Sequence, residues 1–355
     1  MQGKNKFSVL IVLSSFLLLF VSNSFATELG ELSHKIAFLK YGEVWVSDFD
    51  GQKIKQITSD SGKVDDFLFS PSLKYLAYAK IIGYTDEPGL WDDTEKVPQR
   101  AVCSILIMEL ETRKIIKEIM PTEDIWIYIS KWLPEEKLLY YSASGFDVSG
   151  FYAYDIQEDN KEEIDYNKSS IISGTDYSTD GSLKVYVDDS GLGKDFKENL
   201  HLVDSKTNSD RILVSKRSIG DQKISNDKNQ IAFLEVENIE KKYYDILWVY
   251  NIKEDSLQIL YRGPAKAKIG GFNGTSWSLD DRYIGIFFPP EALVIDVKNQ
   301  NKIHRISGES FSWIENEKII FAKGNDIYVY SLGTRKNDLL FRDASKPTFL
   351  WKQNY

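Results

Sequence analysis

The chain has 355 residues, a formal net charge of −9 and one cysteine, Cys103. Its length is sufficient for one large core or for two domains. An acidic chain repels nucleic acid and anionic lipid headgroups, so we expect no nucleic-acid partner. One cysteine excludes a disulfide within the chain, so the fold must be stabilised by core packing.

The N-terminal segment has the pattern of a secretory signal. Lys4 and Lys6 give a basic start, a nearly unbroken apolar run follows at 7–21, and Ser24 and Ala26 are small residues before a cleavage point. This pattern predicts a signal peptide at 1–26 and an exported protein, either periplasmic or secreted. We expect no membrane insertion after cleavage. The alternative is an uncleaved membrane anchor.

A repeat with a period of roughly 35–60 residues fills the rest of the chain. In each unit a large residue, which we call the signature residue, lies in a short strand, and an apolar strand follows six or seven residues later. The signature residues are Phe69, Trp132, Tyr177, Ile224, Trp277, Trp313 and Trp351. Four units begin with similar motifs: Phe-Ser-Pro-Ser at 69–72, Tyr-Ser-Thr-Asp-Gly at 177–181, Ile-Ser-Asn-Asp at 224–227 and Trp-Ser-Leu-Asp-Asp at 277–281.

Each unit is predicted to contain four short strands rich in aromatic and β-branched residues. Polar pairs such as Asp180-Gly181 and Asn226-Asp227 separate the first strand from the second, because a tight turn needs residues that tolerate positive φ or bond their own backbone. The third strand usually ends in an acid. These acids, Asp48, Asp155, Asp204 and Asp296, are predicted to cap the following turn.

The two ends of the repeat array are complementary. The first unit starts directly with a second strand at 35–39, and an unpaired first strand remains at 348–354. Pairing these strands completes a seventh unit and removes open sheet edges. We therefore predict an all-β, seven-bladed β-propeller of four-stranded antiparallel blades at 27–355, a single domain closed by the C-terminal strand on the N-terminal blade. An open array or a β-sandwich is the alternative.

The aromatic-Ser-x-Asp motif, followed by Ile-Ala-Phe at 231–233 and by a strand that ends in an acid, resembles the WD40-like repeat of TolB-type propellers. It is similar also to the propellers of prolyl-oligopeptidase-type and dipeptidyl-peptidase-type enzymes. The resemblance covers 35–354 and implies the propeller fold. Only Asp180-Gly181 keeps the full Asp-Gly turn. We expect this sequence to contain neither the N-terminal α/β domain of TolB nor a hydrolase domain.

The longest segments between predicted strands all fall between a second and a third strand, at 81–102, 143–150, 188–199 and 235–245. In a four-stranded meander these segments share one face with the connections between blades, and we call it the insertion face. Long loops in a compact fold are often functional, so we expect a ligand to bind there.

Two groups of residues on the insertion face are candidate ligand-binding residues. The longest segment carries aromatic and acidic residues: Tyr84, Asp86, Glu87, Trp91, Asp92 and Asp93. The connections between blades carry basic residues: Arg217, Arg262, Lys266 and Lys268. Loops of opposite charge could orient a ligand. The alternative is a solvated loop, with Trp91 packed on its own blade, and scattered surface lysines.

The sequence gives little support for catalysis. Its three histidines, His34, His201 and His304, lack metal-ligand spacing, and neither a Gly-x-Ser-x-Gly elbow nor a phosphate-binding loop is present. We expect no catalytic residue, no metal and no cofactor. The favoured hypothesis is an exported binding or scaffold propeller with a protein, peptide or glycan partner in the cell envelope. The alternative is a secreted propeller lyase or hydrolase acting on carbohydrate or peptide.

Overall fold

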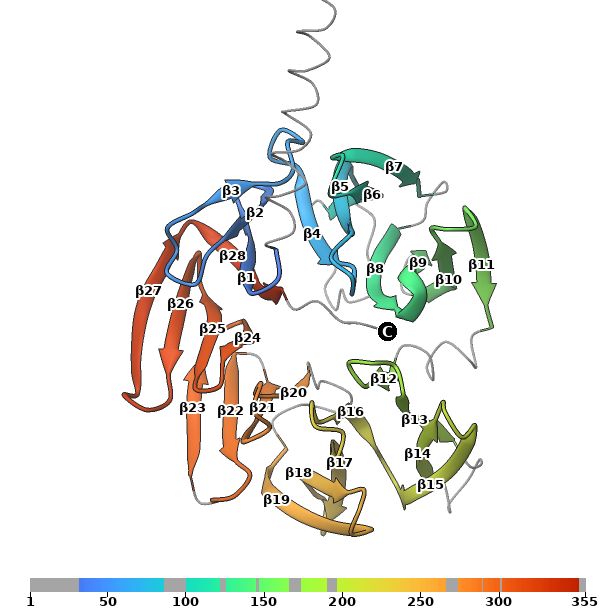
Figure 1. Cartoon of the computed structure of the whole chain (residues 1–355), viewed down its shortest axis with the longest axis vertical. Coiled ribbons are helices and arrows are strands. Elements are labelled where there is room, and N and C mark those ends of the chain that lie inside the picture. Colours follow the sequence, from blue (N-terminus) through green and yellow to red (C-terminus); the bar gives the residue numbers. More distant parts are fainter. Residues whose placement is uncertain are drawn as a thin grey trace, which may run out of the picture.

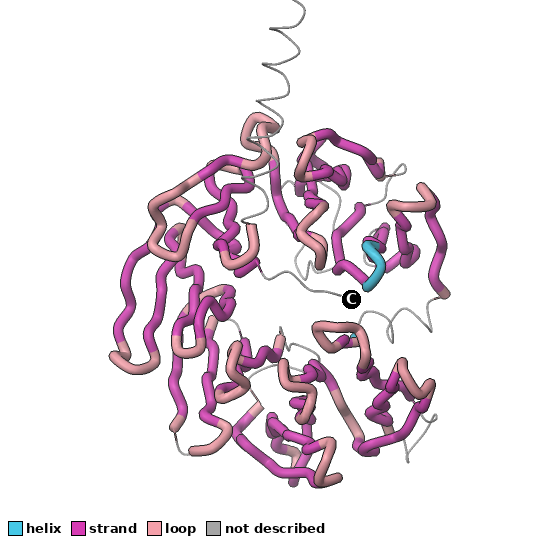
Figure 2. The backbone as a smooth tube through the Cα atoms, viewed as in Figure 1, coloured by secondary structure: helices cyan, strands magenta, loops and turns pink. Residues whose placement is uncertain are grey.

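The computed structural model describes residues 32–85, 100–121, 126–144, 147–165, 174–189, 197–265, 274–288, 290–300 and 302–350. These residues form seven four-stranded antiparallel sheets arranged as blades around a common axis (Figure 1). Strands dominate the described backbone, with one short 3-10 helix, η1, at Pro134–Glu136 (Figure 2). The predicted all-β seven-bladed propeller is confirmed.

The blades are numbered along the chain, and the strands of each run from the inner edge to the outer edge. Blade 1 has β28 (Ala344–Leu350), β1 (Lys35–Lys40), β2 (Glu43–Ser47) and β3 (Lys55–Gln56). Blade 2 has β4 (Val64–Phe69), β5 (Tyr75–Thr85), β6 (Arg100–Glu109) and β7 (Lys114–Ile119). Blade 3 has β8 (Trp126–Leu133), β9 (Lys137–Ser144), β10 (Asp147–Asp155) and β11 (Asn160–Ile164). Blade 4 has β12 (Asp176–Tyr177), β13 (Leu183–Asp189), β14 (Glu198–Asp204) and β15 (Ser209–Lys216).

The last three blades follow the same order. Blade 5 has β16 (Gly220–Ile224), β17 (Gln230–Ile239), β18 (Lys242–Asn251) and β19 (Ser256–Pro264). Blade 6 has β20 (Thr275–Trp277), β21 (Tyr283–Phe288), β22 (Glu291–Asp296) and β23 (Ile303–Ser307). Blade 7 has β24 (Ser310–Glu315), β25 (Lys318–Lys323), β26 (Asp326–Ser331) and β27 (Lys336–Arg342).

The ring closes as expected, because β28 pairs antiparallel with β1. The register corrects one residue of the prediction. Phe349 pairs with Ile36, as Ile224 pairs with Ile231 in blade 5. Phe349, and not Trp351, therefore holds the signature position of blade 1, and Trp351 lies outside the described residues.

The signature residues join neighbouring blades. The indole N–H groups of Trp132 and Trp277 donate to the carbonyls of Leu68 and Lys223 at 3.1 and 3.0 Å. That of Trp313 donates to the Ser276 hydroxyl at 3.1 Å. Each acceptor immediately precedes the signature residue of the preceding blade. A polar contact thus accompanies the burial of each of these large rings, as buried polar groups require.

The polar turns behave as the sequence predicts. Ser178, Ser225 and Ser278 follow the signature residues, and each hydroxyl accepts the first N–H of the next strand at 2.9–3.0 Å. The same hydroxyls donate to Asp180, Asp227 and Asp280. Three residues further on, φ is positive at Gly181, Lys228 and Asp281, which lets the chain reverse.

The acids after the third strands also cap turns, with one exception. Asp155, Asp204 and Asp296 each accept two backbone N–H groups of the turn that follows. Asp48 instead bonds the ammonium group of Lys35 at 2.5 Å. In blade 1 the third strand therefore ends in an ion pair to β1.

Two of the segments expected to be insertions are largely strand. In blade 5, β17 and β18 extend to a two-residue turn at Glu240 and Lys241, which both have positive φ. In blade 3, β9 runs to Ser144 and β10 begins at Asp147. The segments at 235–245 and 143–150 thus lengthen hairpins, and they are not long loops. In blade 2, β5 and β6 likewise extend through 81–85 and 100–102.

Apolar clusters fill the junctions between blades. Among the described residues, six of the seven junctions contain a cluster of buried residues, and the junction of blades 3 and 4 has none. Typical members are Leu76 between blades 1 and 2, Leu138 between blades 2 and 3, and Phe321 between blades 6 and 7. Most of the ring is held by burial of apolar surface.

Candidate functional site

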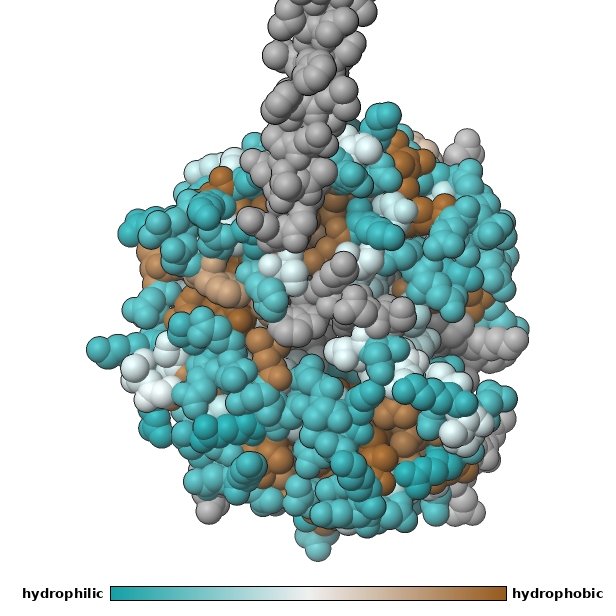
Figure 3. Space-filling view, viewed as in Figure 1, coloured by the Kyte–Doolittle hydropathy of each residue, from teal (hydrophilic) through white to brown (hydrophobic). Residues whose placement is uncertain are grey.

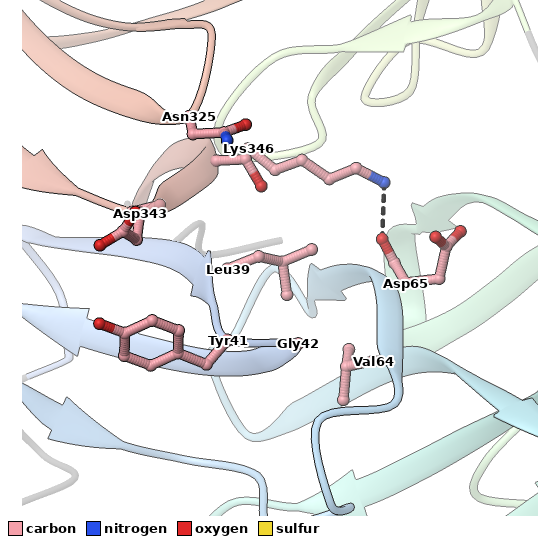
Figure 4. Close-up of a pocket in the computed structure, with 10 residues that line it drawn as sticks. Leu39, Tyr41, Gly42, Val64, Asp65, Asn325, Asp343 and Lys346 are labelled. Carbon is pink, nitrogen blue, oxygen red and sulfur yellow. Dashed lines mark hydrogen bonds between the residues drawn. The ribbon is translucent and has the colours of Figure 1, made fainter.

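A hollow of about 380 Å³ opens on the insertion face, close to the inner strands. Figure 4 shows its walls, which come from blades 7, 1 and 2. The lining residues are Leu39, Tyr41, Gly42, Val64, Asp65, Asn325, Asp343, Ala344, Ser345 and Lys346. They belong to the β1–β2 turn, the β25–β26 turn, the connection from β27 to β28 and the start of β4.

Tight turns fix the walls of this hollow. Tyr41 and Gly42 form the two-residue turn between β1 and β2, with φ of 53° and 65°. A Cβ atom at Gly42 would lie 2.2 Å from the Gly62 carbonyl oxygen, so only glycine permits this approach. The Gly42 carbonyl then accepts the Val64 N–H at 2.8 Å, and the Asn325 carbonyl accepts the Ala344 N–H at 2.8 Å.

Lys346 ties two walls together. Its ammonium group donates to the Asp65 carbonyl at 2.7 Å, drawn as the dashed line in Figure 4, and to the Asp66 carboxylate at 3.0 Å. This contact joins β28 of blade 1 to β4 of blade 2 across the hollow. The charge of Asp66 is thereby neutralised at the rim.

Two further carboxylates lie on opposite walls. Asp65 and Asp343 are exposed, and neither carboxylate forms a hydrogen bond or ion pair with another residue of the described ranges. Beside them the Tyr41 ring is 66% exposed, with the Lys40 ammonium 5.1 Å from its centroid. The hollow is thus lined by carboxylates, an amide, a hydroxyl and an exposed ring. Such a lining suits a ligand rich in hydrogen-bond donors or positive charge.

The predicted residues lie elsewhere or outside the described ranges. Tyr84, at the end of β5, is 63% exposed, and Arg217 is exposed between β15 and β16. Arg262 pairs with Glu237 and lies over the Tyr244 ring in the outer part of blade 5. None of these three lines the hollow. The other candidates lie outside the described residues: Asp86, Glu87, Trp91, Asp92, Asp93, Lys266 and Lys268.

The side chains around the hollow come from segments about 300 residues apart, so no local motif marks them. The only sequence signal is Tyr-Gly at 41–42, a turn pair directly after the first predicted strand. Across the part of the chain that the structure describes, no group of three or more His, Cys, Asp or Glu side chains could hold a metal. Nor does any helix within those ranges have the length and apolar character needed to cross a membrane.

The visible face of the molecule is predominantly hydrophilic, with apolar atoms scattered in small areas (Figure 3). Large contiguous apolar patches usually mark permanent interfaces or membrane contacts. The polar character of the surface is consistent with recognition through hydrogen bonds and charge.

Comparison with known proteins finds similarity in the fold and not in the sequence. No family model and no curated protein matches the sequence. TolB from Acinetobacter baumannii has 15% identity and a TM-score of 0.43, over 88% of this chain and 66% of that chain. A putative TolB from Agrobacterium tumefaciens has 16% identity and a TM-score of 0.41, over 70% and 93%. An oligogalacturonate lyase in complex with manganese has 10% identity and a TM-score of 0.42, over 79% and 85%.

The chain spans less than two thirds of the first of these proteins, and about a third of an acylaminoacyl peptidase that also matches. Propellers of TolB proteins and of hydrolases are thus among the structures that it resembles. The propeller fold that the TolB-like repeat implies is confirmed by the seven four-stranded sheets.

Proposed function

We propose that the chain is an exported, non-catalytic binding or scaffold propeller that engages a protein, peptide or glycan ligand in the cell envelope through its insertion face. The hollow at the inner end of that face carries the proposal. Three blades contribute to it, two exposed carboxylates and an exposed aromatic ring surround it, and turns with fixed backbone geometry hold it. A preformed concave site with a few placed polar groups is the usual form of a binding site.

A cross-linking experiment tests this proposal. A photoreactive amino acid is placed at Tyr41 in the exported protein, and the cross-linked molecule is identified by mass spectrometry. Affinity for that molecule is then measured with Tyr41→Ala and Asp343→Asn. An aromatic residue at an interface centre often contributes about 2 kcal/mol or more, so Tyr41→Ala should weaken binding about thirtyfold.

Tyr243→Ala is the matched control, because Tyr243 is also exposed, at 46%, on a hairpin of the same face but in blade 5. Trp91→Ala is a further arm that tests the long segment of blade 2. Weaker binding by Trp91→Ala alone would move the site to that segment. Equal affinity of the parent, Tyr41→Ala and Asp343→Asn would refute the hollow as the binding site.

Export is tested separately. The signal pattern predicts that the mature protein begins near Thr27 and is recovered outside the cytoplasm without detergent. N-terminal sequencing of the protein from fractionated cells gives the answer. Recovery of a chain that starts at Met1 and is extracted only by detergent would show that the segment is an anchor.

A further inference from the structure

The hollow between blades 7, 1 and 2 has an apolar floor beneath a polar rim. Leu39, Val64 and Ala344 belong to its lining, and all three are buried members of the clusters between these blades. The floor is therefore the outermost layer of the core packing. A short hydrocarbon chain placed on such a floor is removed from water, which stabilises it there.

The positive charges close to the hollow are already engaged or lie outside its lining. Lys346 is the one cation among the lining residues, and its ammonium group is paired with the Asp66 carboxylate at 3.0 Å. The Lys40 ammonium donates to the Arg342 carbonyl at 3.0 Å. Neither Lys63 nor Arg342 lines the hollow, although each lies next to a residue that does. These cations leave the other two carboxylates of the lining unpaired.

Two carboxylates and an aromatic ring are left to meet a ligand. The carboxylates of Asp65 and Asp343 form no hydrogen bond or ion pair with the residues that the structure describes. Figure 4 draws Asp343 on the same side of Leu39 as Tyr41, and Asp65 on the opposite side. The Tyr41 ring keeps 66% of its surface exposed beside the Lys40 ammonium, and aromatic faces attract cations. Positive charge is therefore favoured at this rim, and negative charge is repelled.

We propose that the hollow receives a basic side chain, a lysine or an arginine, of a protein partner. The methylene stem of that side chain lies against Leu39 and Val64. Its cationic end reaches Asp343 and the Tyr41 ring, and Asp65 adds attraction from the opposite wall. Long basic side chains combine an apolar stem with a charged tip, which matches an apolar floor and an acidic rim. The inference rests on the proposed binding function of the hollow and specifies its ligand.

A side chain on a protein suits this site better than a free amine. The hollow has a volume of about 380 Å³, but only three of its lining residues, Leu39, Val64 and Ala344, form the apolar floor. A free alkylamine gains little from so few contacts once it has lost its translational freedom. A partner protein adds contacts on the surrounding surface of the three blades, so the basic side chain contributes to a larger interface.

NMR of the full protein with 13C-labelled methyl groups provides the test, because the methyl groups of Leu39 and Val64 report binding at the hollow itself. Blocked Gly-Lys-Gly and Gly-Arg-Gly peptides are titrated, and saturable shifts of these methyl signals are expected. The same peptide with N-acetyl-lysine keeps the stem without the charge and should bind about tenfold more weakly. A blocked Gly-Glu-Gly peptide should cause no shift.

Asparagine variants isolate the contribution of the two carboxylates. Asparagine tolerates the positive φ of 53° at Asp343, and Asp65→Asn keeps the carbonyl to which Lys346 donates, so both variants should fold. An exposed ion pair contributes modestly, so each variant should bind Gly-Lys-Gly about two- to fivefold more weakly, and the double variant about tenfold. Asp338→Asn is the matched control, because Asp338 is an exposed aspartate on β27 of blade 7 outside the lining.

The molecule cross-linked at Tyr41 distinguishes failure of this inference from failure of the proposed function. If that molecule shifts the Leu39 and Val64 signals and the basic peptides do not, the hollow binds a ligand and the basic side chain is wrong. If neither shifts them, the hollow is not a binding site and both proposals are wrong. Equal affinity for the lysine and acetyl-lysine peptides, or of the parent and the double variant, would also overturn the inference. Free butylamine that binds as tightly as Gly-Lys-Gly would show a small amine in place of a protein partner.

Discussion

His304 shows how packing between two blades sets the chemistry of a single side chain. It lies in β23 and is 4% exposed, and its Nδ1 atom is 3.1 Å from the Tyr330 hydroxyl of blade 7. Within the described structure its Nε2 atom has no hydrogen-bond partner. Burial lowers the pKa of His304, and the charges of Arg335 and Lys302 add to the effect. The imidazole is therefore held neutral in the folded protein.

This arrangement predicts a loss of stability in mild acid. The unfolded chain binds a proton at His304 near pH 6.5, whereas the folded chain resists it, so the free energy of unfolding decreases as pH falls below about 6.5. The slope from one proton is up to about 1.4 kcal/mol per pH unit. His304→Phe should remove this part of the slope in denaturant titrations between pH 7 and 5. Tyr330→Phe, which keeps the histidine, should retain it, and a parent-like slope in His304→Phe would contradict the assignment.

Residues around the hollow mark the limit of sequence-based prediction at this scale. Tyr41, Asp65, Asn325 and Asp343 come from three blades, and each is an ordinary turn or strand-end residue in its own segment. Their proximity depends on ring closure and on the register of β28 with β1. The aromatic and acidic residues at 84–93 stand out in the sequence because they are adjacent in the chain. Adjacency has no bearing on which turns meet near the axis.

At the scale of the element, the hairpin formed by the first and second strands of a blade is the unit that the sequence specifies best. Its signals are local: a signature residue, a serine, an aspartate two residues later and a residue with positive φ. The hairpin of β17 and β18 is harder to predict. Its turn residues, Glu240 and Lys241, adopt positive φ without the Gly or Asn that usually marks such a turn. From the sequence, the polar tip is therefore interpreted as part of an insertion.

Substitution of Ser278 measures how much the serine in the turn between the first and second strands of a blade contributes to stability. Its side chain is fully buried, and its hydroxyl joins the Tyr283 N–H to the Asp280 carboxylate at 2.9 and 2.7 Å. Ser278→Ala leaves a buried N–H without its acceptor, which should lower the free energy of unfolding by about 1–3 kcal/mol. Ser307→Ala, at an exposed position of β23, should change it by less than about 0.5 kcal/mol. Equal melting of both variants would show that water replaces the hydroxyl.

At the scale of the whole molecule, the number of blades and the closure could be predicted because the two ends of the chain are complementary. The position of the last signature residue could not, because Phe349 and Trp351 are both large residues in the expected segment and the sequence alone does not show which of them is opposite Ile36. Pairing with β1 decides it, and Phe349 packs there against Phe49 at 5.6 Å between ring centroids.

The closing strand provides the most direct test of the ring. Deleting residues 348–355 removes Phe349 and Leu350, and Leu350 is 2% exposed and accepts the His34 N–H at 2.8 Å. Truncation of one buried leucine typically costs about 2–5 kcal/mol, so Leu350→Ala alone should lower the melting temperature clearly. The deletion also leaves the inner edge of β1 without its partner over Lys35 to Ala37. We expect loss of cooperative melting and aggregation through this edge.

A peptide that spans 344–355 should restore cooperative melting of the deletion protein, because it binds only the folded ring and stabilises it by mass action. The same peptide with Phe349 and Leu350 replaced by aspartate is the control, since it keeps the length and cannot fill the buried positions. Calorimetry with increasing peptide distinguishes the two. A deletion protein that melts like the parent without any peptide would refute closure by β28, and rescue by the aspartate peptide would show that the apolar side chains are not what holds the strand in place.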